Sequence, residues 1–156
     1  EERNEERQRE EGDAQTREIR RIQKRLQSLA EDATFTDQDH PFERLAYHGN
    51  LASYFADTVA IDLPAGQPPE NRNPTKAEIE AGAATIRNAY RGLDVKFMDI
   101  RVSVDQPPVN ATAYLTSKIY FAGDSVYTIQ ELRVGLVKQE GEWLVKRIEA
   151  VRTMEQ

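Results

Sequence analysis

Four runs of alternating apolar and polar residues fill the last third of the chain, and short turns separate them. They span residues 94–105, 109–121, 125–138 and 142–152. The last run follows a turn that ends at Gly141, and it carries Trp143 near its start. An alternation of period two predicts strands, and short turns between consecutive strands predict antiparallel hairpins. The sequence therefore ends in a predicted antiparallel sheet.

The first half of the chain is patterned for helices. Apolar residues at spacings of three and four predict an amphipathic helix from about Asp13. They are Ile19, Ile22, Leu26, Leu29 and Ala33. Pro41 suits the first turn of a second helix. The predicted inner face of that helix consists of Phe42, Leu45, Ala46, Gly49, Ala52 and Phe55.

One strand and one more helix complete the first half. Residues 58–63 alternate and predict a first strand. Thr75 and Glu78 have the spacing of a capping box, which predicts that a third helix begins there. Three helices followed by a sheet indicate an α+β fold. The chain of 156 residues suits one domain, which we place at residues 13–156.

The first twelve residues differ from the rest because they contain no apolar side chain. A segment that buries nothing cannot offset its ordering entropy, so we predict that residues 1–12 form a charged, flexible lead-in. A stalk is the alternative. The chain begins at Glu1 rather than at Met, which suggests a processed product, and we hypothesise a membrane tether upstream. An extracytoplasmic and a cytoplasmic location both fit the sequence.

The composition excludes several functions. A net charge of −6 argues against nucleic acid and against an anionic membrane surface as the main partner. The chain has no cysteine, which excludes thiolate catalysis and thiolate metal sites. With only His40 and His48, a histidine-rich metal site is not expected, and we predict no cofactor. We interpret the basic residues of the first helix as a solvated face, and these are Arg17, Arg20, Arg21, Lys24 and Arg25.

Three segments carry a resemblance to a known family: Tyr54–Pro64, Ile86–Tyr90 and Leu136–Trp143. Their order and spacing resemble the nuclear-transport-factor-2-like superfamily over roughly residues 15–152. This is the cystatin-like cone of ketosteroid isomerases, scytalone dehydratase, limonene epoxide hydrolase and the polyketide-cyclase-like proteins. The resemblance implies three helices packed on a strongly curved, mixed or antiparallel sheet, with a pocket in the cone. Some members are catalysts, whereas others bind ligands or dimerise through the open sheet face.

The catalytic residues of ketosteroid isomerases are not matched. Those enzymes need a carboxylate immediately before the proline of the first strand, but Leu63 precedes Pro64 here. Asp62 comes one residue earlier, so it should point to the opposite side of the strand. The stretch Glu131–Arg133, where an acid donor is expected, holds no Asp. Asp62 stays a candidate for a shifted base.

Two other chemistries of the family are also incomplete. Asp99 and Arg101 resemble part of the Asp–Arg–Asp arrangement of limonene epoxide hydrolase, but the third member is missing. We predict that they share a strand face as an exposed ion pair. His48, with Tyr47 and Tyr54, is the nearest match to the His and Tyr residues of scytalone dehydratase. Whether the chain is an enzyme stays open at this point, and we favour a protein without catalysis.

Polar residues that continue an apolar strand face are typical of a pocket mouth. Gln130 shares a predicted face with the apolar residues of its strand, and Arg147 and Glu149 are predicted to share a face with Trp143. The predicted ligand-binding residues are Tyr47, Tyr54, Gln130, Trp143, Arg147 and Glu149.

The resemblance leaves two kinds of function open. The chain is predicted to be a non-catalytic domain that binds a small apolar molecule, associates with protein, or does both, as a homodimer through the sheet. The alternative is an isomerase, dehydratase or cyclase that acts on a small apolar substrate through Asp62 or His48.

Overall fold

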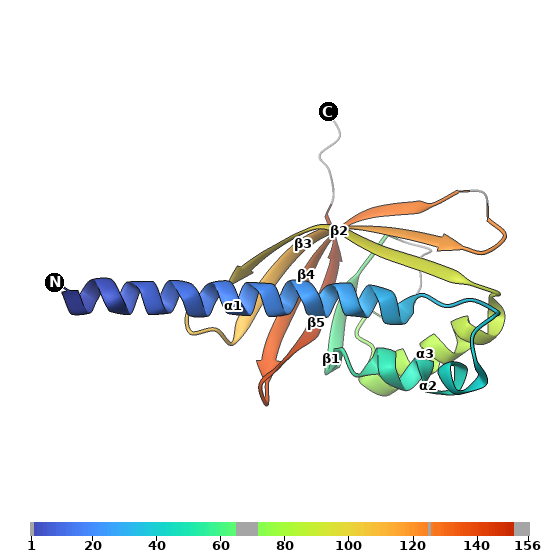
Figure 1. The fold of residues 1–156 in the computed structure, drawn as a ribbon. Coiled ribbons are helices and arrows are strands. Elements are labelled where there is room, and N and C mark those ends of the chain that lie inside the picture. The colour runs from blue at the N-terminus through green and yellow to red at the C-terminus, as the bar shows by residue number, and fades with distance from the viewer. Residues whose placement is uncertain (1, 65–71, 125, 152–156) are drawn as a thin grey trace.

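The computed structural model describes residues 2–64, 72–124 and 126–151, which form an α+β fold as predicted. In chain order the elements are α1 (Glu2–Ala33), α2 (Pro41–Ala52), β1 (Phe55–Asp62), α3 (Lys76–Ala89), β2 (Leu93–Val104), β3 (Asn110–Phe121), β4 (Thr128–Gln139) and β5 (Glu142–Ala150). Helix α1 crosses one face of the sheet. Helices α2 and α3 lie together near the C-terminal end of α1 (Figure 1).

The five strands form one mixed sheet in the order β1-β5-β4-β3-β2. Strands β2 to β5 pair as consecutive antiparallel hairpins, as their short turns predict. Strand β1 pairs in parallel with β5, which makes the sheet mixed. We call the side of the sheet that faces α1 the inner face and the opposite side the outer face.

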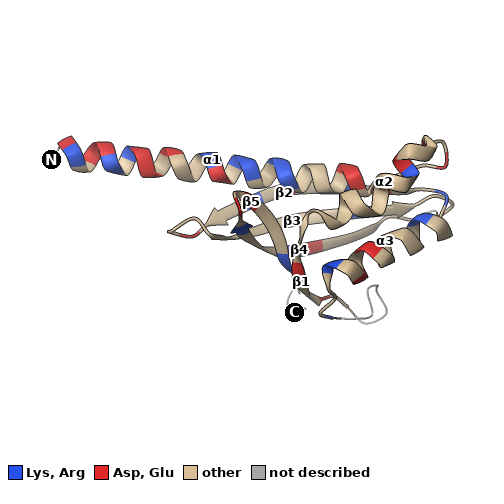
Figure 2. Cartoon of the chain, turned by 90° about the horizontal axis from the view of Figure 1, so that it is seen from below, with Lys and Arg blue, Asp and Glu red and all other residues tan. Residues whose placement is uncertain are grey.

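Helix α1 begins at Glu2, well before the predicted start near Asp13. Residues 2–14 are all exposed, and this part of the helix extends beyond the sheet (Figure 1). Charges of both signs follow one another along it (Figure 2). Opposite charges on neighbouring turns can support a solvated helix, which needs no apolar stripe.

The second half of α1 provides the centre of the core. Its apolar stripe is buried, with Ile22 at 0% and Leu26 at 1% exposure. These side chains pack in one cluster with Leu136, Trp143 and Val145 from the inner face of β4 and β5. The burial of such aliphatic side chains stabilises the fold by roughly 1.5–3 kcal/mol each.

Polar side chains of α1 also cover the edge of the sheet. The amides of Gln15 and Gln23 donate to the backbone oxygens of Val104 (3.1 Å) and Ile100 (3.2 Å) in edge strand β2. An uncovered edge strand can pair with another chain, and these bonds occupy part of that edge. Arg25 is also bound, because its Nε donates to the Trp143 oxygen (3.0 Å). The interpretation of the basic residues as a solvated face is therefore wrong for Arg25.

The other edge strand, β1, is covered by the segment that leads into α3. The amides of Val59 and Ile61 donate to the oxygens of Pro74 (3.0 Å) and Arg72 (2.7 Å). The predicted capping box is confirmed, since the Thr75 hydroxyl accepts from the Glu78 amide at 3.2 Å and the Glu78 carboxylate accepts from the Thr75 amide at 3.3 Å. This cap fixes the start of α3 next to the end of the covering segment.

The predicted inner face of α2 is correct only at its end. Phe42 and Leu45 are 75% and 73% exposed, whereas Ala52 and Phe55 are buried as predicted. Nearer its start the helix packs through Tyr47, whose ring meets Phe35 edge-on at 5.2 Å between centroids. This contact with Phe35, two residues after the end of α1, turns the buried face of α2 away from Phe42 and Leu45.

A β-bulge in β2 changes which side chains face the core. The pairing with β3 shifts between Met98 and Arg101, so the alternation is interrupted there. Met98, which the unbroken alternation placed with the buried residues, is 38% exposed on the outer face. Asp99, inside the bulge, has a φ of 54° and does not share a face with Arg101. The predicted Asp99–Arg101 ion pair is therefore wrong.

A second bulge lies between β4 and β5. Gly135 pairs with Arg147, while the next residue, Leu136, pairs with Val145, so β5 carries one extra residue. Trp143 and Val145 face the core, but Arg147 and Glu149 face outward. The prediction that Arg147 and Glu149 share a face with Trp143 is wrong, because the bulge reverses the alternation between Val145 and Arg147.

The packing of α1 should dominate stability. Ile22→Ala removes a fully buried side chain and is expected to lower the free energy of unfolding by about 2–5 kcal/mol. Leu45→Ala is the matched control, because Leu45 is 73% exposed, and it should change the value by less than about 0.5 kcal/mol. Urea denaturation measures both. Similar losses in the two variants would contradict the central place of α1 in the core.

Candidate functional site

The interior of the cone, where the fold would place a pocket, is filled by side chains. Two buried clusters occupy it, one under α1 and one between α2, α3 and the start of the sheet. The second cluster includes Phe35, Tyr47, Leu93 and Val95, all at most 9% exposed. The two hollows described below lie outside these clusters.

The two tyrosines predicted to bind a ligand each donate a hydrogen bond within the protein. The Tyr47 hydroxyl donates to the Ala33 oxygen at 2.8 Å, and the Tyr54 hydroxyl donates to Asp32 at 2.5 Å. Burial raises the pKa of Tyr47 to about 12, and burial together with Asp32 does the same for Tyr54. Both phenols are therefore neutral hydrogen-bond donors near pH 7.

Trp143, another predicted ligand residue, lies in the core at 3% exposure. Its indole N–H donates to Glu18 at 2.6 Å, and Lys138 donates to the same carboxylate at 3.0 Å. Burial opposes the ionisation of Glu18, but these two partners outweigh it and lower the pKa of the carboxyl group. The cluster joins α1 to the β4–β5 hairpin.

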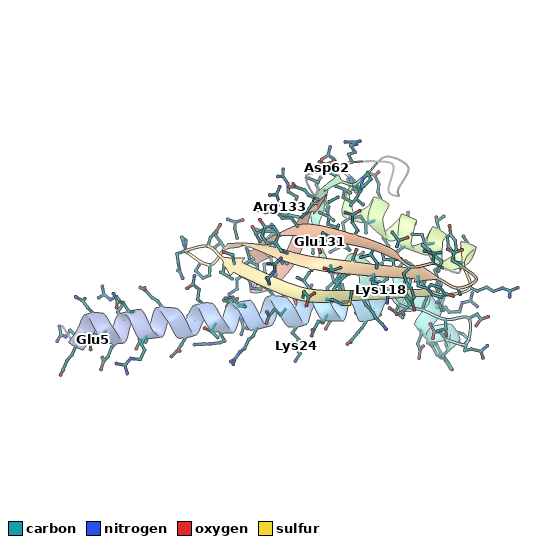
Figure 3. All side chains as sticks on the ribbon, turned by 90° about the horizontal axis from the view of Figure 1, so that it is seen from above. Glu5, Lys24, Asp62, Lys118, Glu131 and Arg133 are labelled. Carbon is teal, nitrogen blue, oxygen red and sulfur yellow. The ribbon has the colours of Figure 1, made fainter. Side chains whose placement is uncertain are left out.

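The two candidate catalytic residues are not brought together. Asp62 is on the outer face and forms an ion pair with Arg72 at 3.7 Å. His48 is on α2, and its Nε2 lies 3.7 Å from a carboxylate oxygen of Glu80 on α3. Asp62 lies on the side of the sheet away from α1 (Figure 3). Their catalytic roles stay predictions, without a shared pocket in the described part of the chain.

The predicted ligand residues Arg147 and Glu149 form a cluster on the outer face. Glu149 accepts from Arg147 at 3.0 Å and from Arg133, whose hydrogen bond contributes most to lowering the pKa of Glu149. The cluster lines a hollow of about 630 Å³, with Gly135 among its lining residues. Gln130 lies further along β4, and its amide donates to the Glu131 oxygen at 3.2 Å.

Exposed apolar side chains gather elsewhere on the outer face. We call this the outer apolar patch, and it consists of the exposed Met98, Tyr114, Tyr127 and Ile129 together with the half-buried Tyr120. Met98, Tyr114 and Tyr127 are 37–42% exposed, and Ile129 is 63% exposed. The rings of Tyr120 and Tyr127 contact each other at 4.8 Å between centroids, and Lys118 lies 4.0 Å from the centre of the Tyr127 ring.

A groove runs between α1 and the bulge of β2. We call it the α1–β2 groove, and it has a volume of about 570 Å³. It is lined by Arg20, Gln23, Lys24, Gln27, Phe97, Asp99 and Ile100. No sequence pattern predicted this groove, because it depends on the position of the bulge opposite α1.

A buried arginine was also missed from the sequence. Arg87 of α3 is 5% exposed, and its guanidinium lies 4.3 Å from the centre of the Phe35 ring. Its Nη2 donates to Asp39 at 3.1 Å, while its Nε and Nη1 have no hydrogen-bond partner among the described residues. Within the described residues, Asp39 is the carboxylate that pairs with this charge, and the Phe35 ring adds a cation–π contact.

Two further features are absent from the described residues, a membrane-spanning helix and a metal-binding cluster. No helix in the described residues is long and apolar enough to cross a membrane. Within the same residues, no group of three or more His, Cys, Asp or Glu side chains could hold a metal ion.

Solved structures show which fold this is. A candidate scytalone dehydratase from Novosphingobium aromaticivorans matches with a TM-score of 0.63 at 16% identity, over 92% of this chain and 89% of that one. A candidate dehydratase of the NTF2-like family from Streptomyces avermitilis gives 0.65 at 14% identity, over 90% and 99%. A protein of unknown function with a cystatin-like fold from Nostoc punctiforme gives 0.58 at 14%, over 86% and 91%.

The chain therefore has the nuclear-transport-factor-2-like fold, the cystatin-like cone, which confirms the predicted fold. No protein-family model matches the chain, and no curated protein matches it. At these identities the likeness extends to the fold alone, because one fold carries many unrelated activities.

The Arg87–Asp39 pair should be required for stability and should respond to pH. Burial opposes the ionisation of Asp39, but Thr36 and Arg87 outweigh it and lower the pKa of the carboxyl group. Asp39→Ala leaves a buried charge without its partner and is expected to cost on the order of 3 kcal/mol at pH 7. Because the folded pKa is lowered, this difference from wild type is complete above about pH 4 and shrinks as the pH falls further.

Asp37→Ala is the matched control for this prediction. Asp37 is an exposed acid two residues away, and its carboxylate has only a 3.5 Å contact with Gln38. Thermal unfolding between pH 3 and pH 7 measures both variants. A pH-independent loss in Asp39→Ala, or an equal loss in Asp37→Ala, would contradict the role given to the ion pair.

Proposed function

We propose that this chain is a non-catalytic association domain that forms a homodimer through the outer apolar patch. The observation that carries the proposal is this group of exposed aromatic and aliphatic side chains on a sheet face that no helix covers. Contiguous exposed apolar residues on a soluble protein mark an interaction surface more often than single exposed residues do.

The chemistry of the patch suits a protein partner. Tyrosine and methionine are enriched in interfaces, since they bury much apolar area while the tyrosine hydroxyl keeps a polar contact. Lys118 and Glu131 lie among the patch residues on the outer face, at register positions opposite Ile129 and Thr116 (Figure 3). A non-obligate interface taken as a whole is about as polar as the rest of a protein surface, so charged side chains among the apolar ones are compatible with an interface.

A second copy of the chain is the simplest partner. A two-fold axis through the outer face would place the same patch of each copy against the other, which is the arrangement of an isologous dimer. A stable interface buries about 800 Å² on each partner. The charged cluster around Glu149 lies on the same face and would form the wetter part of the contact.

The catalytic alternative has weaker support. Some structural relatives carry names of candidate dehydratases, but Asp62 and His48 here have separate ion-pair partners on different elements. A general base must reach the proton that it removes, and an acid and a base must act on one substrate.

The oligomeric state tests the proposal. Sedimentation velocity of the wild type is expected to show a dimer, and Ile129→Lys should weaken it at least about tenfold because a charge enters the apolar contact. Leu45→Lys is the matched control, since Leu45 is 73% exposed on α2 and should leave the dimer unchanged. A wild-type monomer at high concentration, or a dimer that resists Ile129→Lys, would overturn the proposal.

A further inference from the structure

The α1–β2 groove has the size of a ligand site. Its volume of about 570 Å³ falls within the roughly 300–1,000 Å³ of small-molecule sites. It lies along α1, whereas the outer apolar patch lies on the opposite face of the sheet. A ligand there would not compete with the proposed dimer, so the two can be tested separately.

One wall of the groove carries two cations that have no partner among the described residues. Arg20 and Lys24 lie one turn apart on α1, a spacing at which two like charges repel each other. Two neighbouring cations of the same helix do have partners, since Arg21 pairs with Glu18 at 3.4 Å and Arg25 binds two backbone oxygens at 3.0 Å. An anion between Arg20 and Lys24 would relieve the repulsion.

The opposite wall is formed by the bulge of β2. Asp99 is held there with its φ of 54°, and no ion pair joins it to Arg20 or Lys24 within the described residues. The cations and the carboxylate therefore stand on opposite walls with open space between them. An occupant can reach the cations without displacing a salt bridge.

The rest of the lining favours an apolar body. Phe97 and Ile100 are half-buried and pack against the core, so they offer a fixed apolar surface. Gln23 holds the two walls together, because its amide donates to the Ile100 oxygen at 3.2 Å. A groove that is fixed before binding loses less entropy when a ligand enters.

We propose that the α1–β2 groove binds a small amphipathic anion, with its carboxylate, sulfonate or phosphate group between Arg20 and Lys24 and its apolar body on Phe97 and Ile100. Asp99 orients the ligand, because it repels the anionic group from the bulge side. This places the anionic end at α1 and the apolar end at the sheet.

The probe for the test is 8-anilinonaphthalene-1-sulfonate, which joins a sulfonate to an aromatic body. Its affinity is measured by fluorescence titration, and its position by amide chemical-shift mapping. Shifts are expected at Phe97, Asp99 and Ile100. The double variant Arg20→Gln/Lys24→Gln should weaken binding on the order of tenfold, because two charge-assisted contacts are lost.

Two further variants make the test specific. Arg3→Gln/Arg7→Gln removes two charges at the same spacing on the same helix, outside the groove, and should leave the affinity unchanged. Asp99→Asn should tighten binding roughly twofold, as expected when one negative charge several ångströms from an anion is removed in water. Circular dichroism checks that each variant is folded.

Two outcomes would overturn the proposal. One is an equal loss of affinity in the two double variants, which would mean that only net charge matters. The other is a set of chemical-shift changes confined to the outer apolar patch, with none at Phe97 or Ile100. Tighter binding in Asp99→Asn together with weaker binding in Arg20→Gln/Lys24→Gln would support both the site and the orientation.

Discussion

The structure depends on the packing of one helix against the inner face of a curved sheet. The apolar stripe of α1 supplies the centre of the main cluster, and the Glu18–Trp143 hydrogen bond fixes the same helix to the β4–β5 hairpin. Gln15 and Gln23 add bonds to the edge strand. Apolar burial gives most of the stabilisation, but it is non-directional and does not by itself set the position of α1 on the sheet. The polar contacts select that position. The core, the edge and the groove all follow from this single arrangement.

Two clusters of buried side chains pack the space between the helices and the inner face of the sheet. Aromatic rings and Arg87 occupy the space between α2, α3 and the sheet. A buried guanidinium with one carboxylate partner is costly, and it persists because Asp39 and the Phe35 ring both stabilise the charge. The cost of that arrangement indicates that the closed interior is held by specific contacts and is more than a collapsed apolar space.

The sequence predicted the fold because the order of its elements is strongly patterned and because three segments resembled a known family. The capping box at Thr75 and the hairpin turns are local signals, and the structure confirms them. The prediction that Phe42 and Leu45 of α2 face inward was wrong because Tyr47 packs on Phe35, and no periodicity reveals that contact. The predicted strand face of Arg147 and Glu149 was wrong for a related reason, since a single bulge reverses the alternation of side chains along β5. Pairs that form through tertiary contacts, such as Arg87 with Asp39, leave no local pattern.

The two bulges have a consequence for how such a protein can change. Each bulge divides a strand into two parts. If odd-numbered residues face inward in one part, even-numbered residues face inward in the other. Loss or gain of one residue at the bulge would turn a whole strand end over while leaving the paired part intact. An insertion or deletion at a bulge can therefore exchange the inward and outward residues of one strand end at a single step, while the rest of the sheet keeps its pattern.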